Sequence, residues 1–130
     1  MTVGAKNTTT LWRPVGRKEL NLIEESGWKS FPPRLPDQPI FYPVLNFQYA
    51  EQIARDWNSV REEGDFEGYV TEFEVAADFL GRYEPQNAGA DGSHDELWVP
   101  AEELDEFNDA IVGRVTVVAK YVKKKRVPHE

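Results

Sequence analysis

Runs of apolar residues along the chain predict five β-strands. From Tyr69 to Val75 every second residue is suited to burial, a period of two that is typical of a strand with one buried face. Val115–Val122 carries apolar residues on both faces, which predicts a strand in the interior of a sheet. Three shorter strands are expected over residues 9–15, 40–45 and 96–99.

The helical spacing of other apolar residues predicts three helices. The clearest one follows Asn46, a favourable capping residue, because apolar residues recur after it at the i, i+3, i+4 and i+7 positions of one helix face. A shorter helix is expected over Lys18–Ser26, and another from Pro100 to a glycine stop at Gly113. Residues 76–83 are expected to add a helical turn.

The order of these elements predicts an α+β fold with a mixed β-sheet and helices packed on it. The 130 residues suit a single small domain, with an ordered core over about residues 9–122, a flexible N-terminus over residues 1–8 and a basic tail over residues 123–130. Residues 84–93 contain proline and glycine without periodicity, so a flexible loop is expected there. Whether this loop closes over a ligand stays open.

Charged residues are unevenly spread along the chain. Residues 1–61 carry eight basic and six acidic side chains, residues 62–112 carry one and sixteen, and residues 113–130 carry six and one. The acidic middle argues against nucleic acid as a partner, because it would repel a phosphate backbone. The basic cluster at residues 123–126 is interpreted as part of a solvated tail.

The composition excludes chemistry that depends on cysteine and indicates where the protein is located. The chain contains no cysteine, which excludes disulfides, thiol nucleophiles and cysteine-ligated metals. It has no apolar run of the roughly 20 residues that a membrane-spanning helix needs, and its polar start lacks the apolar centre of a secretory signal. We therefore expect a cytoplasmic protein without a membrane partner.

Standard catalytic and nucleotide-binding motifs are absent from the sequence, including the glycine-rich dinucleotide turn and the phosphate loop. Ser93, His94 and Asp95 are consecutive, so on an extended chain they point in different directions and form no relay by themselves. A divalent metal site built from Asp91, His94, Asp95 and Glu96 is conceivable, but its spacing matches no known ligand loop. A solvated acidic turn explains the same residues, and we expect no metal.

Four segments of the sequence carry a resemblance to a known family: LWRPV at 11–15, PIFYPV at 39–44, YAEQIARDW at 49–57 and ELWVPAEEL at 96–104. They resemble segments of a family of short bacterial proteins that are commonly described as ADP-ribosylation proteins related to a crystallin. The resemblance covers nearly the whole chain. The order of elements is also similar to that of the ADP-ribosyltransferase fold, which implies an ADP-ribosyltransferase-like protein with NAD as its candidate substrate.

This resemblance also implies roles for individual residues. In that superfamily a basic residue at the end of the first strand holds the NAD phosphates or ribose, and Arg13 occupies the matching place. Tyr42, with Phe41 beside it, would line the nicotinamide pocket. Glu96 would stabilise the positive charge that develops as nicotinamide leaves, and His94 would orient the acceptor. The Ser-Thr-Ser motif of one subclass is missing.

The same residues have structural interpretations that need no ligand. Arg13 could pair with a carboxylate, and Glu96 could be an edge charge beside a helix start. Phe41 and Tyr42 could be plain core residues. The same interpretation applies to the four tryptophans of the chain: Trp12, Trp28, Trp57 and Trp98.

A second functional hypothesis is a non-catalytic interaction protein. Its helix after Pro100 carries an acidic face that could hold a basic protein partner: Glu102, Glu103, Asp105, Glu106 and Asp109. A solvated helix face would have the same composition. The sequence thus leaves open a protein that binds NAD or another nucleotide and transfers ADP-ribose, a protein-binding module, and, as a third possibility, a metal-dependent hydrolase.

Overall fold

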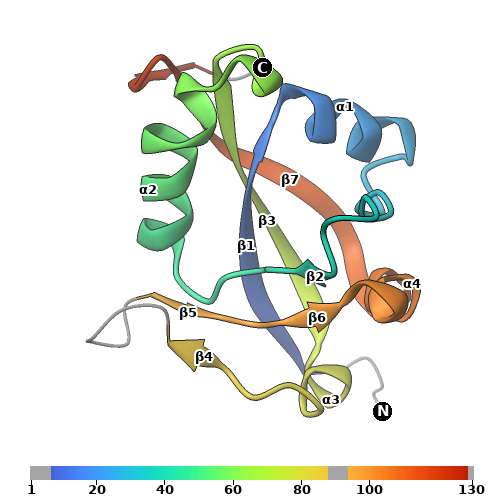
Figure 1. Ribbon diagram of the computed structural model, residues 1–130. Coiled ribbons are helices and arrows are strands. Elements are labelled where there is room, and N and C mark those ends of the chain that lie inside the picture. The colour runs from blue at the N-terminus through green and yellow to red at the C-terminus, as the bar shows by residue number, and fades with distance from the viewer. Residues whose placement is uncertain (1–6, 88–93, 129–130) are drawn as a thin grey trace.

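The computed structural model describes residues 7–87 and 94–128 as an α+β fold (Figure 1). Its main sheet contains four strands in the order β1-β3-β7-β8. These strands are β1 (Thr8–Gly16), β3 (Glu67–Ala76), β7 (Ile111–Val122) and β8 (Lys125–Val127). The α+β class is confirmed, but every pairing in the sheet is antiparallel, so the expectation of a mixed sheet is wrong.

Strand β3 lies between β1 and β7 and is buried on both faces. Tyr69 and Phe73 belong to the larger hydrophobic cluster, whereas Val70, which points to the opposite face, belongs to a smaller one. Both faces of the main sheet are therefore covered. In Figure 1, α1 (Arg17–Glu25) lies on one side of the strands and α2 (Phe47–Asp56) on the other.

Helix α2 forms where the sequence predicts it. The side chain of Asn46 accepts a hydrogen bond from the backbone N–H of Tyr49 at 2.9 Å, which caps the first turn. Its small buried residues, Ala50 and Ala54, let the helix approach the sheet closely. A Cβ atom added to Gly68 of β3 would lie 2.1 Å from the carbonyl oxygen of Ala54, so only glycine fits at this crossing.

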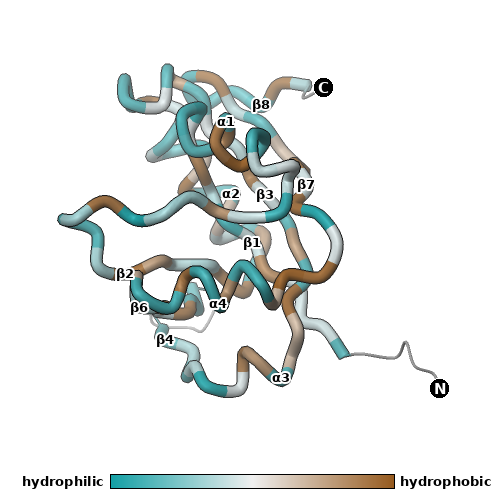
Figure 2. Tube along the Cα trace, turned by 90° about the vertical axis from the view of Figure 1, so that its right-hand side faces the viewer, coloured by the Kyte–Doolittle hydropathy of each residue, from teal (hydrophilic) through white to brown (hydrophobic). Residues whose placement is uncertain are grey.

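A second layer of short strands lies beside the main sheet. One pair joins β2 (Ile40–Phe41) to β6 (Val99–Pro100), and another joins β4 (Gln86–Asn87) to β5 (Asp95–Glu96). Figure 2 shows β2 and β6 together with α4 (Leu104–Asp109) to one side of β1, β3 and β7. Val44 connects the layers, because it forms bridges with both Trp12 and Glu96.

Several predicted boundaries differ from the structure in this second layer. The expected strand over residues 40–45 is reduced to β2 and the bridge at Val44, because Pro43 has no N–H to donate to a ladder. The expected strand over residues 96–99 is split into β5 and β6, which pair with different partners. The helical turn expected over residues 76–83 is confirmed as the short helix α3 (Ala77–Leu80).

The C-terminal part of the chain also differs from its prediction. A 3₁₀ turn (Ala101–Glu103) and α4 replace the helix expected up to Gly113, because the chain from Ile111 onward pairs with β3. Residues 123–126 do not form a free tail, since Lys123 and Lys124 make a turn with positive φ and β8 then pairs with β7. Strand β1 begins at Thr8, one residue earlier than expected.

The flexible N-terminus and the flexible loop expected from the sequence lie largely outside the described part of the chain, which leaves out residues 1–6 and 88–93. Two further 3₁₀ turns, Asn58–Val60 and Glu62–Gly64, connect α2 to β3. Among the helices of the described ranges, none has the length and apolar character needed to cross a membrane.

Candidate functional site

A hollow of about 500 Å³ brings three of the predicted site residues together: Arg13, Tyr42 and Glu96. We call it the Glu96 hollow. Its wall is formed by the end of β1, the chain that follows β2, the C-terminal turn of α2, and β5 with the residues after it. Sites for cofactors and small molecules have volumes of about 300–1,000 Å³, so this hollow is large enough to hold one.

The Glu96 carboxylate is held by one hydrogen bond on each oxygen. The Tyr49 hydroxyl donates to Oε1 at 2.9 Å, and the Trp98 indole Nε1 donates to Oε2 at 2.7 Å. Both donors are neutral, and within the described residues no cation forms an ion pair with Glu96. Its negative charge is therefore oriented by the protein without being neutralised, as in a carboxylate that stabilises a cation.

Tyr49 is suited to remain a hydrogen-bond donor to this carboxylate. Burial, and then the hydrogen bond to Glu96, raise the pKa of the Tyr49 phenol to about 12. The phenol therefore keeps its proton at neutral pH. Its ring also packs edge-on against the His94 imidazole, with 4.6 Å between the ring centroids.

Arg13 is nearly buried and its donors are already engaged. Its Nε and Nη2 donate to the two carboxylate oxygens of Glu19 at 2.7 and 3.0 Å, and its Nη1 donates to the Tyr42 carbonyl oxygen at 3.4 Å. The guanidinium carbon lies 4.6 Å from the centroid of the Phe41 ring. This arrangement matches the carboxylate-paired interpretation of Arg13, and it leaves little of the guanidinium for a ligand.

Exposed aromatic side chains surround the Glu96 hollow. Tyr42, Trp57 and Trp98 are 40%, 56% and 49% exposed, and all three line it. Tyr42 and Trp98 contact each other edge to face, with ring centroids 6.3 Å apart. The core interpretation is therefore wrong for these three residues. Large apolar surfaces left in contact with water around a hollow are typical of a site that binds a ring-containing ligand.

Two other predicted site residues lie outside this lining. Phe41 is fully buried and packs against Phe31 and Phe107, so it reaches the site only as the surface beneath Arg13. His94 does not line the hollow; its Nε2 lies 3.3 Å from the Gln52 amide oxygen and its ring packs against that of Tyr49.

The described residues include no group of three or more histidine, aspartate or glutamate side chains arranged to hold a metal ion. Asp91, one of the four residues of the conceivable metal site, lies outside the described part of the chain.

A second hollow, of about 350 Å³, adjoins the first. We call it the Arg34 hollow. The two share five lining residues: Gly16, Glu19, Gln38, Trp57 and Asn58. Cationic side chains line the second hollow, namely Lys18, Arg34 and Arg61, together with the exposed apolar residues Leu22 and Leu35. Two carboxylates, Glu19 and Glu63, also line the Arg34 hollow. Because the two hollows share lining residues, they form parts of one groove.

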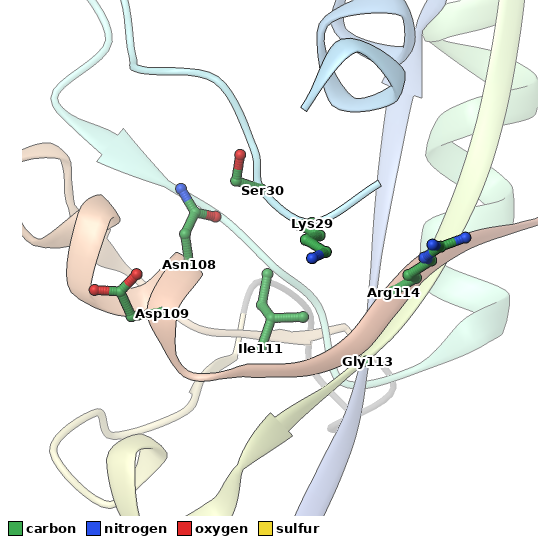
Figure 3. A pocket seen from close by; sticks show the side chains of 7 residues that line it. All are labelled: Lys29, Ser30, Asn108, Asp109, Ile111, Gly113 and Arg114. Carbon is green, nitrogen blue, oxygen red and sulfur yellow. The ribbon is translucent and has the colours of Figure 1, made fainter. Parts of the chain in front are cut away.

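A larger hollow of about 600 Å³ near β7 is less suited to chemistry (Figure 3). Asn108, one of its lining residues, is used structurally, since it accepts from the Phe31 backbone N–H at 2.9 Å and donates to the Phe31 carbonyl at 3.0 Å. Figure 3 also shows the Arg114 side chain extending along β7, away from Lys29 and Asp109. The charged groups of this hollow do not converge on one point.

The acidic face around α4 is partly used inside the molecule. Glu103 accepts a hydrogen bond from the Tyr83 hydroxyl at 2.6 Å, and Glu106 lies 3.6 Å from Arg82. Glu106 is nevertheless exposed, as are Glu102, Asp105 and Asp109. A protein-binding role for this face stays a prediction.

Sequence reasoning missed three contributors to the site. Trp98 follows Glu96 at a spacing of two, so alternation along an extended chain was a signal that both point the same way. Tyr49 was assigned only to the family resemblance, and its contact with Glu96 depends on how α2 meets β5. Arg34 lies in a proline-rich loop and gave no signal at all.

The chain was also compared with known proteins. No family model, no curated protein sequence and no solved structure matches it.

Proposed function

We propose that the Glu96 hollow binds the nicotinamide ribose of NAD and that the protein transfers ADP-ribose from it. The observation that supports this most is the Glu96 carboxylate, which lines a hollow with exposed aromatic walls, accepts hydrogen bonds from two neutral donors and forms no ion pair within the described residues. Such a group interacts more strongly with a developing cation than with the ground state, and this difference accelerates a reaction.

The proposed step breaks the bond between the ribose anomeric carbon and the nicotinamide ring nitrogen. The bonding electron pair leaves with nicotinamide, whose ring becomes neutral, and the positive charge passes to the ribose. A lone pair of an acceptor, or of water, then forms the new bond to the anomeric carbon and the acceptor's proton is released. Glu96 would stabilise the cationic ribose by charge and through its contact with a ribose hydroxyl.

The aromatic residues support the placement of the nicotinamide end. Tyr42 and Trp98 meet edge to face beside Glu96, so a planar ring can pack against them while the attached ribose faces the carboxylate. Arg13 has a supporting role in this proposal. Its engagement with Glu19 and with the Tyr42 carbonyl fixes the wall that carries the Tyr42 ring.

The proposal is tested by following nicotinamide release from NAD by the purified protein and by its Glu96→Gln variant. We expect release by the wild type and a loss of about a hundredfold in Glu96→Gln, the size found when one electrostatic contact to a transition state is removed. Glu103→Gln is the matched control, because this carboxylate also accepts from a tyrosine hydroxyl but lies outside the hollow. Its rate should equal that of the wild type.

Two results would contradict the proposal. One is no release of nicotinamide by the wild type above the uncatalysed rate, and the other is equal release by the wild type and Glu96→Gln. If the wild type is inactive and instead captures a single protein in a salt-sensitive way, the interaction-module hypothesis gains support.

A further inference from the structure

We propose that Arg34 is the phosphate contact of the ligand and that the Arg34 hollow holds its nucleoside diphosphate part. This inference rests on the proposed function, since it extends the nucleotide from the Glu96 hollow into the adjoining one. It assigns the phosphate role to a residue other than Arg13, whose side chain is occupied by Glu19.

The charge balance around Arg34 supports this assignment. Arg13 and Arg34 both lie over the Phe41 ring, at 4.6 and 5.9 Å from its centroid, and Glu19 is the carboxylate beside them. Because Arg13 takes both oxygens of Glu19, one positive charge remains without a counterion. Arg34 forms no ion pair with any residue that the structure describes.

The environment of the Arg34 guanidinium is costly for a cation. Burial, and then the nearby charge of Arg13, lower the pKa of Arg34, while Glu19 partly opposes this. Its Nε is buried and has no hydrogen-bond partner. A buried donor without a hydrogen-bond partner destabilises the folded protein. A bound phosphate would remove this cost, because it supplies both a negative charge and acceptor oxygens.

A second unsatisfied atom lies in the lining of the same groove. The Asn58 side-chain oxygen is buried without a hydrogen-bond partner, and Asn58 lines both hollows. Together with the Arg34 Nε it makes up the unpartnered buried side-chain atoms found within residues 7–87 and 94–128. The Asn58 oxygen can accept a hydrogen bond from a ribose hydroxyl, and the Arg34 Nε can donate one to a phosphate oxygen. The two atoms therefore match the donor and acceptor groups of a nucleoside phosphate.

Aromatic residues in both hollows suit a ligand with two rings. Trp57 is exposed and lines both hollows, and the Arg61 guanidinium carbon lies 4.2 Å from its ring centroid. A ring on each side of the phosphates would then contact Tyr42 and Trp98 in one hollow and Trp57 with the apolar residues in the other. A pyrophosphate is the link that connects two such nucleoside parts.

The test is calorimetric titration of the wild type, Arg34→Gln and Arg34→Lys with ADP-ribose. We expect Arg34→Gln to bind about ten- to a hundredfold more weakly, since one charged hydrogen-bonding partner is lost. Arg34→Lys should recover part of the affinity, because it keeps the charge without the planar fork. Arg82→Gln, which lines neither hollow, is the matched control and should bind as the wild type does.

Two further measurements separate a binding role from a structural one and from the proposed function. Arg34→Gln should be at least as stable to urea as the wild type, because Arg34 forms no ion pair within the described residues, its buried Nε has no hydrogen-bond partner, and its contact with the Phe41 ring is long at 5.9 Å. Nicotinamide riboside, which lacks the pyrophosphate, should bind to both proteins equally. Absence of ADP-ribose binding by the wild type, or equal affinity in Arg34→Gln, would overturn this inference. Failure of nicotinamide release alone would overturn only the proposed function.

Discussion

Replacing Glu19 by glutamine should destabilise the fold through the arginine that it neutralises. The Glu19 and Arg13 side chains are 21% and 10% exposed, and Arg34 places a second positive charge beside them. Removing one partner of a buried ion pair costs about 3–5 kcal/mol, because the other charge is left uncompensated. Glutamine keeps one acceptor oxygen and the hollow is partly wet, so we expect a loss of about 2–3 kcal/mol.

This loss is measured by urea unfolding followed by tryptophan fluorescence. Thermal unfolding gives a second measurement. For 130 residues the unfolding entropy is about 0.27 kcal/mol/K, so the same loss should lower the melting temperature by about 7–11 °C. Glu63→Gln is the control, because its contact with Arg61 is 3.6 Å long and exposed, and it should change stability by less than about 0.5 kcal/mol.

A double variant, Arg13→Met with Glu19→Leu, distinguishes the charge effect from a packing effect. If an uncompensated charge causes the loss, removing both charges should restore most of the stability, since apolar pairs of similar volume replace buried ion pairs well. The reasoning is refuted if Glu19→Gln is as stable as the wild type, or if the double variant is less stable than the single one.

Two further predictions concern the packing of α2 and the network at Glu96. Gly68→Ala should destabilise the fold by more than about 3 kcal/mol or prevent folding, because the added Cβ would lie 2.1 Å from a backbone oxygen of α2. Gly81→Ala is the control, since the nearest atom to its added Cβ is 3.4 Å away. Circular dichroism should show that this control folds normally. The pKa of Tyr49 is raised on folding from 10.0 to about 12, so its contribution to stability is complete below pH 10 and is lost as the pH rises through 12. Tyr49→Phe should therefore lose less stability than the wild type between pH 10 and pH 12 in urea titrations. An equal loss in both proteins would contradict the raised pKa of Tyr49.

Local patterns in the sequence predicted the elements whose stabilising contacts are local or regular. The cap at Asn46 and the helical spacing after it gave α2, and the alternation from Tyr69 to Val75 gave β3. The prediction failed where pairing between distant segments decides the outcome. Ile111 has helical spacing relative to Phe107, but its backbone pairs with Val75 and so belongs to β7. In the same way, the basic residues after Lys124 form a strand because they pair with the edge of β7.

The site could be predicted only in part for the same reason. Arg13, Tyr42 and Glu96 were expected together because of a family resemblance, and the fold does place them around one hollow. Their hydrogen-bond partners depend on how α1 and α2 dock, which no local pattern contains. The exposure of Trp57 shows a second limit, since a large apolar side chain is usually buried but can also form the wall of a binding site.

The Glu96 hollow is assembled from segments that are far apart along the chain, with Val44 as the connection between the main sheet and β5. The lining residues are spread from Arg13 to Trp98 and come together only when the chain folds, so a molecule that fits the hollow binds the folded form and not the unfolded one. Such a molecule should therefore protect the described elements from proteolysis that requires unfolding, in proportion to its concentration relative to its dissociation constant. Resistance to a protease can thus rank candidate nucleotides before any reaction is known.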